Sequence, residues 1–512
     1  MKRLACLILT ASILIIALFG GLVPSGSVHA QTSVTGTLTC NTEWTVAQSP
    51  ISLNGSLTVG TNVTLTIDPE VTVNMGNYGL TVYGNLIAQG NAGDPITING
   101  NTNQEYSSNA IMFMQNYSAN VASSPSIIQN AVLNSVAVNI DSGASTEVDN
   151  CTFNYGALYE GPITVTDSPA SISNNIINYN AQNSQYNVNL VSVYSCSPTI
   201  SNNQFEGSFS ANNVAISVSG GSPIISGNAF AAAYCNNSFG VEVASGSPQI
   251  DNNQFQGNGW LIGVDGQYSA SFTVSDNVFT NCYFGVNAED GTLTVQGNQF
   301  LKGTDGIDID PAATVTVTDN LIDSNSRYGI NGGGTITSNT ISNNQIGIHN
   351  PPSGIISQNN VVGNTQNSIT STIEDVNAQN NWWGTTDTAA INQTIYDKKI
   401  DPHLGTVLFV PFLNAPSTSA PAIPSYTPAT TPPPTQQQST PAPTPTEQPI
   451  VTPVVPTATP VQFSQTFDYQ VGSLLNLNMI TTATALVLVL VWVVVILGYV
   501  VKGAIPKRKP KE

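Results

Sequence analysis

The sequence predicts an all-β protein whose chain winds into a parallel solenoid. The 512-residue chain is rich in turn-forming Asn, Ser and Gly and in strand-forming Val and Thr. A short pattern recurs along most of its length, and that region shows no helical period. Hydrophobic residues make up 40% of the chain, which is enough for a large core. This composition excludes a wholly disordered protein and a helix-rich enzyme.

The recurring pattern is an aliphatic residue, two small or polar residues, Asn, any residue, and an aromatic or aliphatic residue. Residues 200–205 (ISNNQF) and 250–255 (IDNNQF) are examples. The Asn recurs with spacings between 19 and 28 residues, at Asn175, Asn203, Asn228, Asn253, Asn277, Asn298, Asn320, Asn339 and Asn359. Cys151 takes the same slot one repeat earlier. About half a repeat later a second short strand follows a glycine, as in residues 239–243.

A unit of this length cannot fold alone, because its apolar face needs a neighbour on each side. Such units stack as turns of a solenoid, with parallel strands about 4.8 Å apart. We expect the repeated Asn residues to form a side-chain ladder in one turn, each amide bonding the next. Leucine-rich repeats fit poorly because Leu is scarce and no helix separates the strands, and propeller blades are longer than these repeats.

The residues also resemble those of a known family. Residues 57–69 and 80–90 are similar to the N-terminal turns of right-handed parallel β-helix proteins, and Asn380-Asn381-Trp382-Trp383-Gly384 resembles the ending of secreted members. Pectate lyases and many carbohydrate-binding surface proteins share this architecture. The resemblance covers about residues 50–413 and implies the fold. It does not imply one activity, because the fold carries lyases, hydrolases, accessory proteins and adhesins.

Both ends of the chain read as membrane signals. Residues 1–30 have the basic start, apolar run and small-residue cleavage pattern of a secretory signal. Residues 480–501 are uncharged and long enough to span a bilayer, and the basic residues in 502–512 predict a cytoplasmic tail. Residues 414–479 hold a Pro- and Thr-rich stretch that predicts an extended stalk. The β-helix domain is therefore assigned to residues 31–413, outside the cell membrane.

Charge narrows the class of partner. The formal net charge is −19, from 11 Lys and Arg against 30 Asp and Glu. Nucleic acids are excluded as partners, because phosphate binding depends on clusters of basic residues. We expect a polysaccharide or a cell-surface glycoprotein instead. Asn54, Asn62, Asn116, Asn236 and Asn392 are candidate N-glycosylation acceptors. Asn150 also has the motif, but it lies in the ladder turn, where burial would block modification.

One row of polar residues is the candidate site. Alignment of the repeats on the glycine of the second strand places six residues at one position, which predicts an outward stripe: Glu242, Asp265, Asn287, Asp308, Asn331 and His349. Asp310 shares the face of Asp308, and Asp305 precedes it. Asp308 and Asp310, or Asp265 and Asp308, have the spacing that an inverting glycosidase needs. Asp305, Asp308 and Asp310 are also candidate ligands for Ca²⁺, which prefers oxygen donors.

The competing interpretation is an ordinary solvated surface, since polar side chains on an exposed solenoid face also discourage edge pairing. A lyase of the resembling family uses a basic residue beside bound calcium, and only Lys302 and Arg327 lie near the stripe. Trp382 and Trp383 are either a sugar platform or part of the cap of the solenoid. The cysteines fall at different offsets, which predicts buried thiols and not disulfides between turns.

The sequence therefore predicts a surface-anchored β-helix that has a non-catalytic binding or envelope-structural role and requires no cofactor. Its long polar face, which includes Glu242, Asn287 and Asn331, suits an extended polysaccharide. The alternative is a polysaccharide hydrolase or lyase with Asp265, Asp308 and Asp310 as its acids. A role in loading a metal enzyme is disfavoured because the sequence has no cluster of Cys, His and Met ligands.

Overall fold

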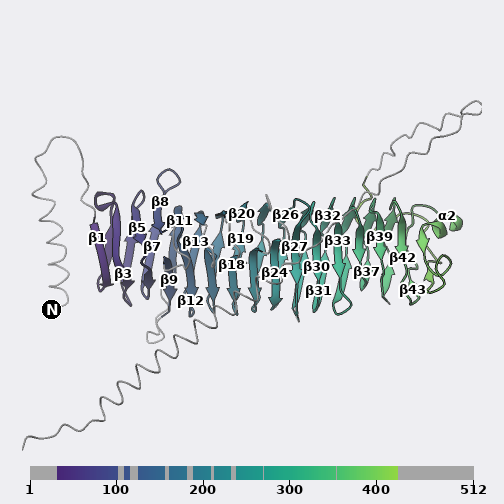
Figure 1. The fold of residues 1–512 in the computed structure, drawn as a ribbon, viewed down its shortest axis with the longest axis horizontal. Helices are drawn as coiled ribbons and strands as arrows, with labels where there is room; N and C mark the ends of the chain where they lie inside the picture. Colours follow the sequence, from purple (N-terminus) through teal and green to yellow (C-terminus); the bar gives the residue numbers. More distant parts are fainter. Residues whose placement is uncertain are drawn as a thin grey trace, which may run out of the picture. The chain divides into compact units, whose positions relative to one another are not determined.

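The computed structural model describes residues 32–101, 109–115, 125–155, 161–180, 188–208, 213–231, 238–268, 270–352 and 354–424. The predicted signal, transmembrane segment and cytoplasmic tail, and the stalk beyond residue 424, lie outside these residues. Within them, no helix is both long and apolar enough to cross a bilayer. The described chain forms the predicted right-handed parallel β-solenoid, in which each regular turn contributes one strand to each of three stacks (Figure 1).

The three stacks form the three faces of the solenoid. One turn illustrates their order: β25 (Gln249–Asp251) lies on face 1, β26 (Gln254–Gln256) on face 2 and β27 (Leu261–Gly266) on face 3. Face 1 is a 14-stranded sheet. Its remaining strands are β2 (Thr42–Trp44), β4 (Thr64–Ile67), β7 (Asn85–Gln89), β10 (Ser126–Gln129), β13 (Thr146–Asp149), β16 (Ala170–Ser173), β19 (Thr199–Ser201), β22 (Ile224–Ser226), β28 (Ser271–Ser275), β31 (Thr292–Gln296), β34 (Thr314–Thr318), β37 (Thr335–Thr337) and β40 (Ile355–Ser357).

Faces 2 and 3 belong to one 29-stranded sheet, because β3 (Ile51–Val59) pairs with the first strand of each face and with β1 (Thr32–Leu38). Face 2 continues with β5 (Thr72–Gly76), β8 (Ile96–Gly100), β11 (Ala131–Asn134), β14 (Thr152–Tyr155), β17 (Ile176–Asn180), β20 (Gln204–Ser208), β23 (Ala229–Ala231), β29 (Val278–Thr280), β32 (Gln299–Leu301), β35 (Leu321–Asp323), β38 (Thr340–Ser342) and β41 (Asn360–Val362). Face 3 contains β6 (Leu80–Val82), β9 (Ala110–Met114), β12 (Ala137–Asp141), β15 (Ile163–Thr166), β18 (Asn189–Tyr194), β21 (Val214–Ser219), β24 (Ser238–Ser245), β30 (Phe284–Ala288), β33 (Asp305–Ile309), β36 (Tyr328–Asn331), β39 (Ile346–His349), β42 (Asn367–Thr370) and β44 (Ile395–Tyr396).

The core consists of inward side chains stacked from turn to turn. The aromatic residue of the repeat pattern forms a column of parallel rings on face 2, with centroids 4.5–4.9 Å apart, from Phe205 through Phe230, Phe255 and Phe279 to Phe300. The recurring glycine of face 3 makes room for this column. A Cβ on Gly263 would lie 2.5 Å from the Phe279 ring and 2.5 Å from a backbone oxygen of the next turn.

The predicted asparagine ladder is present in the turn between faces 1 and 2. Asn253 is fully buried, and its Oδ1 accepts bonds from the backbone N–H and from the Nδ2 of Asn228, at 2.9 and 3.0 Å. Its own Nδ2 donates to the Ile225 carbonyl and to Asn277 Oδ1. The same bonds recur from Asn175 to Asn359, and Asn381 is a further member. Cys151 occupies the first slot, as predicted, and its thiol donates to the Ile128 carbonyl.

A second, shorter ladder lies in the turn between faces 2 and 3. Asn325 Nδ2 donates to Asn344 Oδ1 at 2.9 Å, and Asn344 Nδ2 donates to Asn364 Oδ1 at 3.2 Å. This ladder was not predicted from the sequence. Cys282 lies in the same turn two repeats before Asn325, fully buried, and burial raises the pKa of its thiol to about 12. Cys151, Cys196 and Cys282 are buried thiols outside any disulfide, which confirms the prediction for them.

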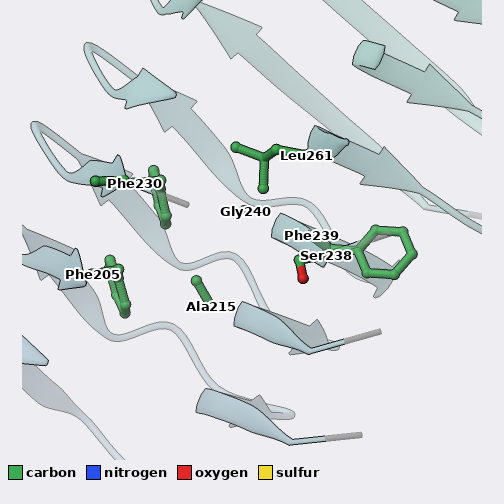
Figure 2. A pocket seen from close by; sticks show the side chains of 8 residues that line it. Phe205, Ala215, Phe230, Ser238, Phe239, Gly240 and Leu261 are labelled. Atoms are coloured by element: carbon green, nitrogen blue, oxygen red, sulfur yellow. The ribbon is translucent and has the colours of Figure 1, made fainter. Parts of the chain in front are cut away.

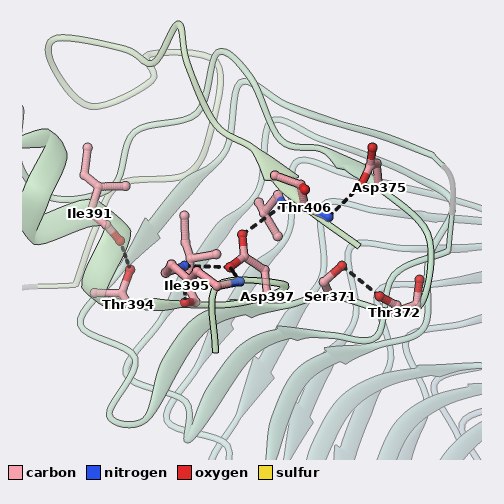
Figure 3. A network of polar contacts seen from close by, with 10 residues as sticks. Ser371, Thr372, Asp375, Ile391, Thr394, Ile395, Asp397 and Thr406 are labelled. Carbon is pink, nitrogen blue, oxygen red and sulfur yellow. Dashed lines mark hydrogen bonds and ion pairs between the residues drawn. The ribbon is translucent and has the colours of Figure 1, made fainter. Parts of the chain in front are cut away.

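A cap closes the C-terminal end of the solenoid. It contains the helix α2 (Thr388–Gln393), which begins after the capping residue Asp387, and the strands β43 (Val376–Asn377) and β45 (Val407–Leu408). The N-terminal part holds one short 3-10 helix, η1 (Val46–Gln48). Figure 3 shows the polar network of the cap, in which the buried Asp397 accepts bonds from Lys399 and from the Val407 backbone. Burial opposes ionisation, but these bonds together keep the pKa of Asp397 below its usual value.

The chain after the cap lies against face 2. Ser417 and Asn360 exchange backbone-to-side-chain bonds, the hydroxyls of Ser419 and Ser338 lie 3.1 Å apart, and Thr340 bonds the Pro421 carbonyl. The stalk boundary at residue 414 stays a prediction. Within the described residues, the segment 414–421 crosses the outer surface of the last turns.

Candidate functional site

The stripe predicted from the sequence lies on face 3. Its six members occupy equivalent positions on consecutive strands from β24 to β39, and each pairs in register with the next: Glu242, Asp265, Asn287, Asp308, Asn331 and His349. The row extends N-terminally through Ser192 and Ser217. Parallel strands about 4.8 Å apart therefore align these side chains along the axis of the solenoid. The register prediction is confirmed.

The accessibility of Asp265 differs from the prediction of an exposed stripe. Its side chain is 1% exposed, because neighbouring amides enclose it. Asn287 Nδ2 donates to its Oδ1 at 2.7 Å and Gln267 Nε2 donates to its Oδ2 at 2.6 Å. Burial raises the pKa of Asp265, and the nearby Glu242 raises it further, against the lowering effect of the two amides. Asp265 therefore contacts its amide neighbours and is almost completely shielded from solvent.

The other carboxyl groups of the stripe are half-buried and also have raised pKa values. Burial is the main cause for Glu242, which lies beside Ser217 and Gln267. Burial is also the main cause for Asp308, and the charges of Asp305 and Asp310 add to it while the amide of Asn331 acts against it. Each carboxylate accepts a bond from an amide or hydroxyl and keeps further acceptor capacity. The stripe is therefore a row of hydrogen-bond acceptors held in place by amide donors.

Asp305 forms a buried ion pair beside the stripe. Its side chain is fully buried and forms an ion pair with Arg327, whose Nε lies 2.8 Å from Oδ1 and whose second nitrogen bonds Oδ2. The Tyr328 backbone N–H also donates to it at 3.1 Å. This bidentate pairing uses the acceptor positions that a calcium ion would need. Lys302 is exposed in the turn between faces 2 and 3.

A line of flat side chains runs beside the stripe, and the sequence analysis did not identify it. We call Trp260, Tyr283, Phe284, Arg327 and Tyr328 the ledge. Trp260, 50% exposed, lies parallel to Tyr283 at 6.2 Å, and Tyr283 contacts Phe284 at 4.5 Å. The Arg327 guanidinium lies 4.8 Å over the Tyr328 ring.

The ledge meets the stripe at its C-terminal end. The rings of Tyr328 and His349 stack at 4.1 Å with an interplanar angle of 11°. His349 Nδ1 lies 2.8 Å from the Thr370 hydroxyl. Burial lowers the pKa of His349, so the imidazole is neutral at neutral pH and its ring can stack without a charge. Ledge and stripe together form one strip along face 3, with flat faces on one side and acceptors on the other.

The predicted Ca²⁺ ligands are Asp305, Asp308 and Asp310. Among the described residues, no group of three or more His, Cys, Asp and Glu side chains is placed to hold a metal ion. Asp308 is half-buried and Asp310 exposed, while Asp305 is engaged by Arg327. The Ca²⁺ site at Asp305, Asp308 and Asp310 stays a prediction.

Figure 2 shows a small apolar pocket between face 2 and face 3. The rings of Phe205 and Phe230 line one side, and Phe239, Gly240 and Leu261 line the other. Among its lining residues, Ser238 alone has a polar side chain. The pocket offers no acid, base or nucleophile other than that hydroxyl, so it adds no catalytic chemistry to the strip.

The remaining predicted residues lie away from the strip. Trp383 is buried in the C-terminal cap, where its ring meets Phe409 edge-on at 6.4 Å, and Trp382 is half-buried and bridges to Asn360. Both positions fit the capping interpretation. The acceptor residues Asn54, Asn62 and Asn392 are exposed, whereas Asn116 and Asn236 lie outside the described residues. Asn150 is also exposed, contrary to the expected burial, because its neighbour Cys151 fills the ladder slot.

Comparison with known proteins supports the architecture. Residues 189–346 match the family model of the right-handed β-helix region. A search of the curated proteins found no match. The matched segment contains the ledge and all members of the stripe except His349. The family match and the three parallel stacks confirm the predicted resemblance: the described chain has the right-handed parallel β-helix fold, and that fold is consistent with a polysaccharide-related role.

Proposed function

We propose that this chain is a membrane-anchored cell-surface protein that binds polysaccharide along face 3 without cleaving it. The observation that carries the proposal is the strip itself, in which stacked flat side chains run parallel to a row of hydrogen-bond acceptors. The strip follows the axis of the solenoid over at least five consecutive turns, from Trp260 to His349. It therefore suits an extended ligand more than a compact one.

The chemistry of a glycan matches both sides of the strip. A pyranose ring has a face of C–H groups that packs on aromatic rings, and hydroxyl groups at its edge that donate to carboxylates and amides. The ledge offers the rings of Trp260, Tyr283 and Tyr328, while Asp308 and Asn331 provide acceptors and donors on the other side. Since the turns are about 4.8 Å apart, the polar residues of the stripe recur at a spacing close to the length of one sugar unit.

Binding is favoured over catalysis by the partners of the carboxylates. Asp265 is enclosed by Asn287 and Gln267, and Asp305 is bound by Arg327. Because of these contacts, Asp308 is the carboxyl group of the three that could best act as a general acid. The raised pKa of Asp308 is the observation that favours the second candidate function, a polysaccharide hydrolase, because a general acid must hold its proton near the working pH.

The proposal includes the cellular location of the protein. The apolar segments 1–30 and 480–501 and the basic tail predict a single-pass protein with the β-helix outside the cell. The acceptor residues Asn54, Asn62 and Asn392 are exposed and available for glycosylation. A neighbouring surface glycoprotein would present the same sugar chemistry to the strip.

The test uses the full-length protein in detergent micelles on a panel of polysaccharides, with Ca²⁺ and with a chelator. Retention on a polysaccharide without release of reducing ends or unsaturated products supports binding. Product release that disappears in Asp308→Asn replaces the binding role with the hydrolase. Failure to bind or cleave any glycan of the panel contradicts both functions.

A further inference from the structure

We propose that the strip selects uncharged polysaccharides and rejects polyuronates. This inference rests on the proposed function and adds the class of ligand. It follows from a comparison of two kinds of charge on face 3. Some charges are paired with an opposite charge, and others would face a bound ligand.

Within the part of the chain that the structure describes, the carboxylates on the acceptor side of the strip form no ion pair. Glu242, Asp265 and Asp308 accept bonds from amides or a hydroxyl, which are neutral groups. Glu289 and Asp310, on the same two turns as Asn287 and Asp308, are exposed acids beside them. A carboxylate on every sugar of a ligand would approach several of these groups at once. Like charges at such distances repel one another, and the desolvation of each adds to the cost.

A basic side chain near the strip could attract an acidic polysaccharide, but Arg327 is already paired with Asp305. In the sequence from 240 to 348, the basic side chains are Lys302 and Arg327. Arg327 bonds both oxygens of the buried Asp305 through Nε and one terminal nitrogen, so its charge is already balanced by that carboxylate. Lys302 is exposed in a corner turn.

The ledge provides the attraction for an uncharged sugar chain. Trp260 and Tyr283 lie nearly parallel, 15° apart, on adjacent turns. A flat apolar surface of this kind contacts the C–H face of a sugar and makes no demand on its charge. Neutral hydroxyls can then donate to Asp308 and its neighbours, an interaction that a ligand carboxylate cannot make. Stacking and hydrogen bonding therefore favour an uncharged chain on the same strip that repels an acidic one.

The experiment compares two soluble polymers that differ in charge. Full-length protein in detergent micelles is titrated with a neutral β-linked glucan or mannan and with polygalacturonate, at low and at high salt. We expect the neutral polymer to bind at least about tenfold more tightly than the acidic one at low salt. The difference should shrink in high salt, which screens the repulsion.

Two variants locate the effect. Asp308→Asn with Asp310→Asn should improve the binding of polygalacturonate several-fold relative to that of the neutral polymer, because the two charges are lost and each amide keeps one acceptor oxygen. Asp276→Asn with Asp319→Asn also removes two charges, from turns between faces 1 and 2, and serves as the matched control, with no expected change in selectivity. Equal or tighter binding of polygalacturonate by the wild type would overturn the inference and leave the proposed function intact. Absence of binding to every polymer would overturn the proposed function itself.

Discussion

The asparagine ladder allows the contribution of one side chain to be worked out from its contacts. Asn253 is fully buried between Asn228 and Asn277. In Asn253→Ala, the backbone N–H and the Nδ2 of Asn228 lose their acceptor, and the Ile225 carbonyl loses a donor. Asn277 Oδ1 keeps the bond from the backbone of residue 253. Two donor groups and one carbonyl are therefore left buried without these partners.

The expected cost follows from these lost bonds. A buried polar group without a partner costs about 1–3 kcal/mol, so the loss of partners for three groups should lower the unfolding free energy by about 3–9 kcal/mol. The loss concentrates around three turns, because each turn of a solenoid contacts only its neighbours. Local opening of those turns should therefore become more frequent than in the wild type.

Hydrogen exchange of the Asn228 amide measures this loss directly, together with chemical denaturation of the full chain. Asn252→Gly is the matched control. Residue 252 has a φ of 56°, and the equivalent positions in other turns are Gly227 and Gly297, so this variant should change stability by about 0.5 kcal/mol or less. Unchanged exchange at Asn228 in Asn253→Ala would refute the view that the ladder stabilises the stack.

Further predictions concern the core, the ion pair, the thiols and pH. Phe255→Ala should cost about 3–5 kcal/mol in denaturation, because Phe255 is stacked on both sides. Arg327→Met should cost on the order of 2 kcal/mol by leaving Asp305 buried without a cation, and Asp305→Asn in the same chain should recover part of it. Cys282 should stay unlabelled by maleimide at pH 8 in the folded protein, since its pKa is about 12, and label on unfolding. The folded state binds the proton of Asp308 more tightly than the unfolded chain, so stability should fall as pH rises through the raised pKa, and Asp308→Asn should flatten that part of the pH profile.

The ladder and the register of the stripe could be predicted because both repeat at fixed offsets. The pattern even located Cys151 in its slot, since position in the turn, and not residue type, decides which side chain points into the corner. The second ladder was not predicted because its position in the turn does not hold one residue type. Successive turns have Cys282, Gly303 and Asn325 there. A changing residue hides the period, although the offset from Phe279, Phe300 and Ile322 is constant.

Other features depend on contacts that alignment does not reveal. Asp265 is buried by Gln267, which lies two residues further along the chain, and by Asn287, which lies one turn away. The ledge combines residues from rows of different composition, so no repeat marks it. The docking of Ser417 on Asn360 joins residues 57 positions apart, and proline-rich composition alone predicts a free stalk there.

The affinity of the full-length protein for a neutral polysaccharide, compared between the wild type and Tyr328→Ala, tests the central claim most directly. Loss of one stacking ring is worth about 0.5–1.5 kcal/mol, so Tyr328→Ala should weaken binding roughly two- to tenfold. Tyr328→Phe retains the ring and should bind nearly as well as the wild type. Tyr83→Ala removes an exposed tyrosine from the turn that follows β6, outside the strip, and should leave the affinity unchanged. Unaltered binding by a folded Tyr328→Ala variant would contradict the assignment of face 3 as the glycan-binding surface.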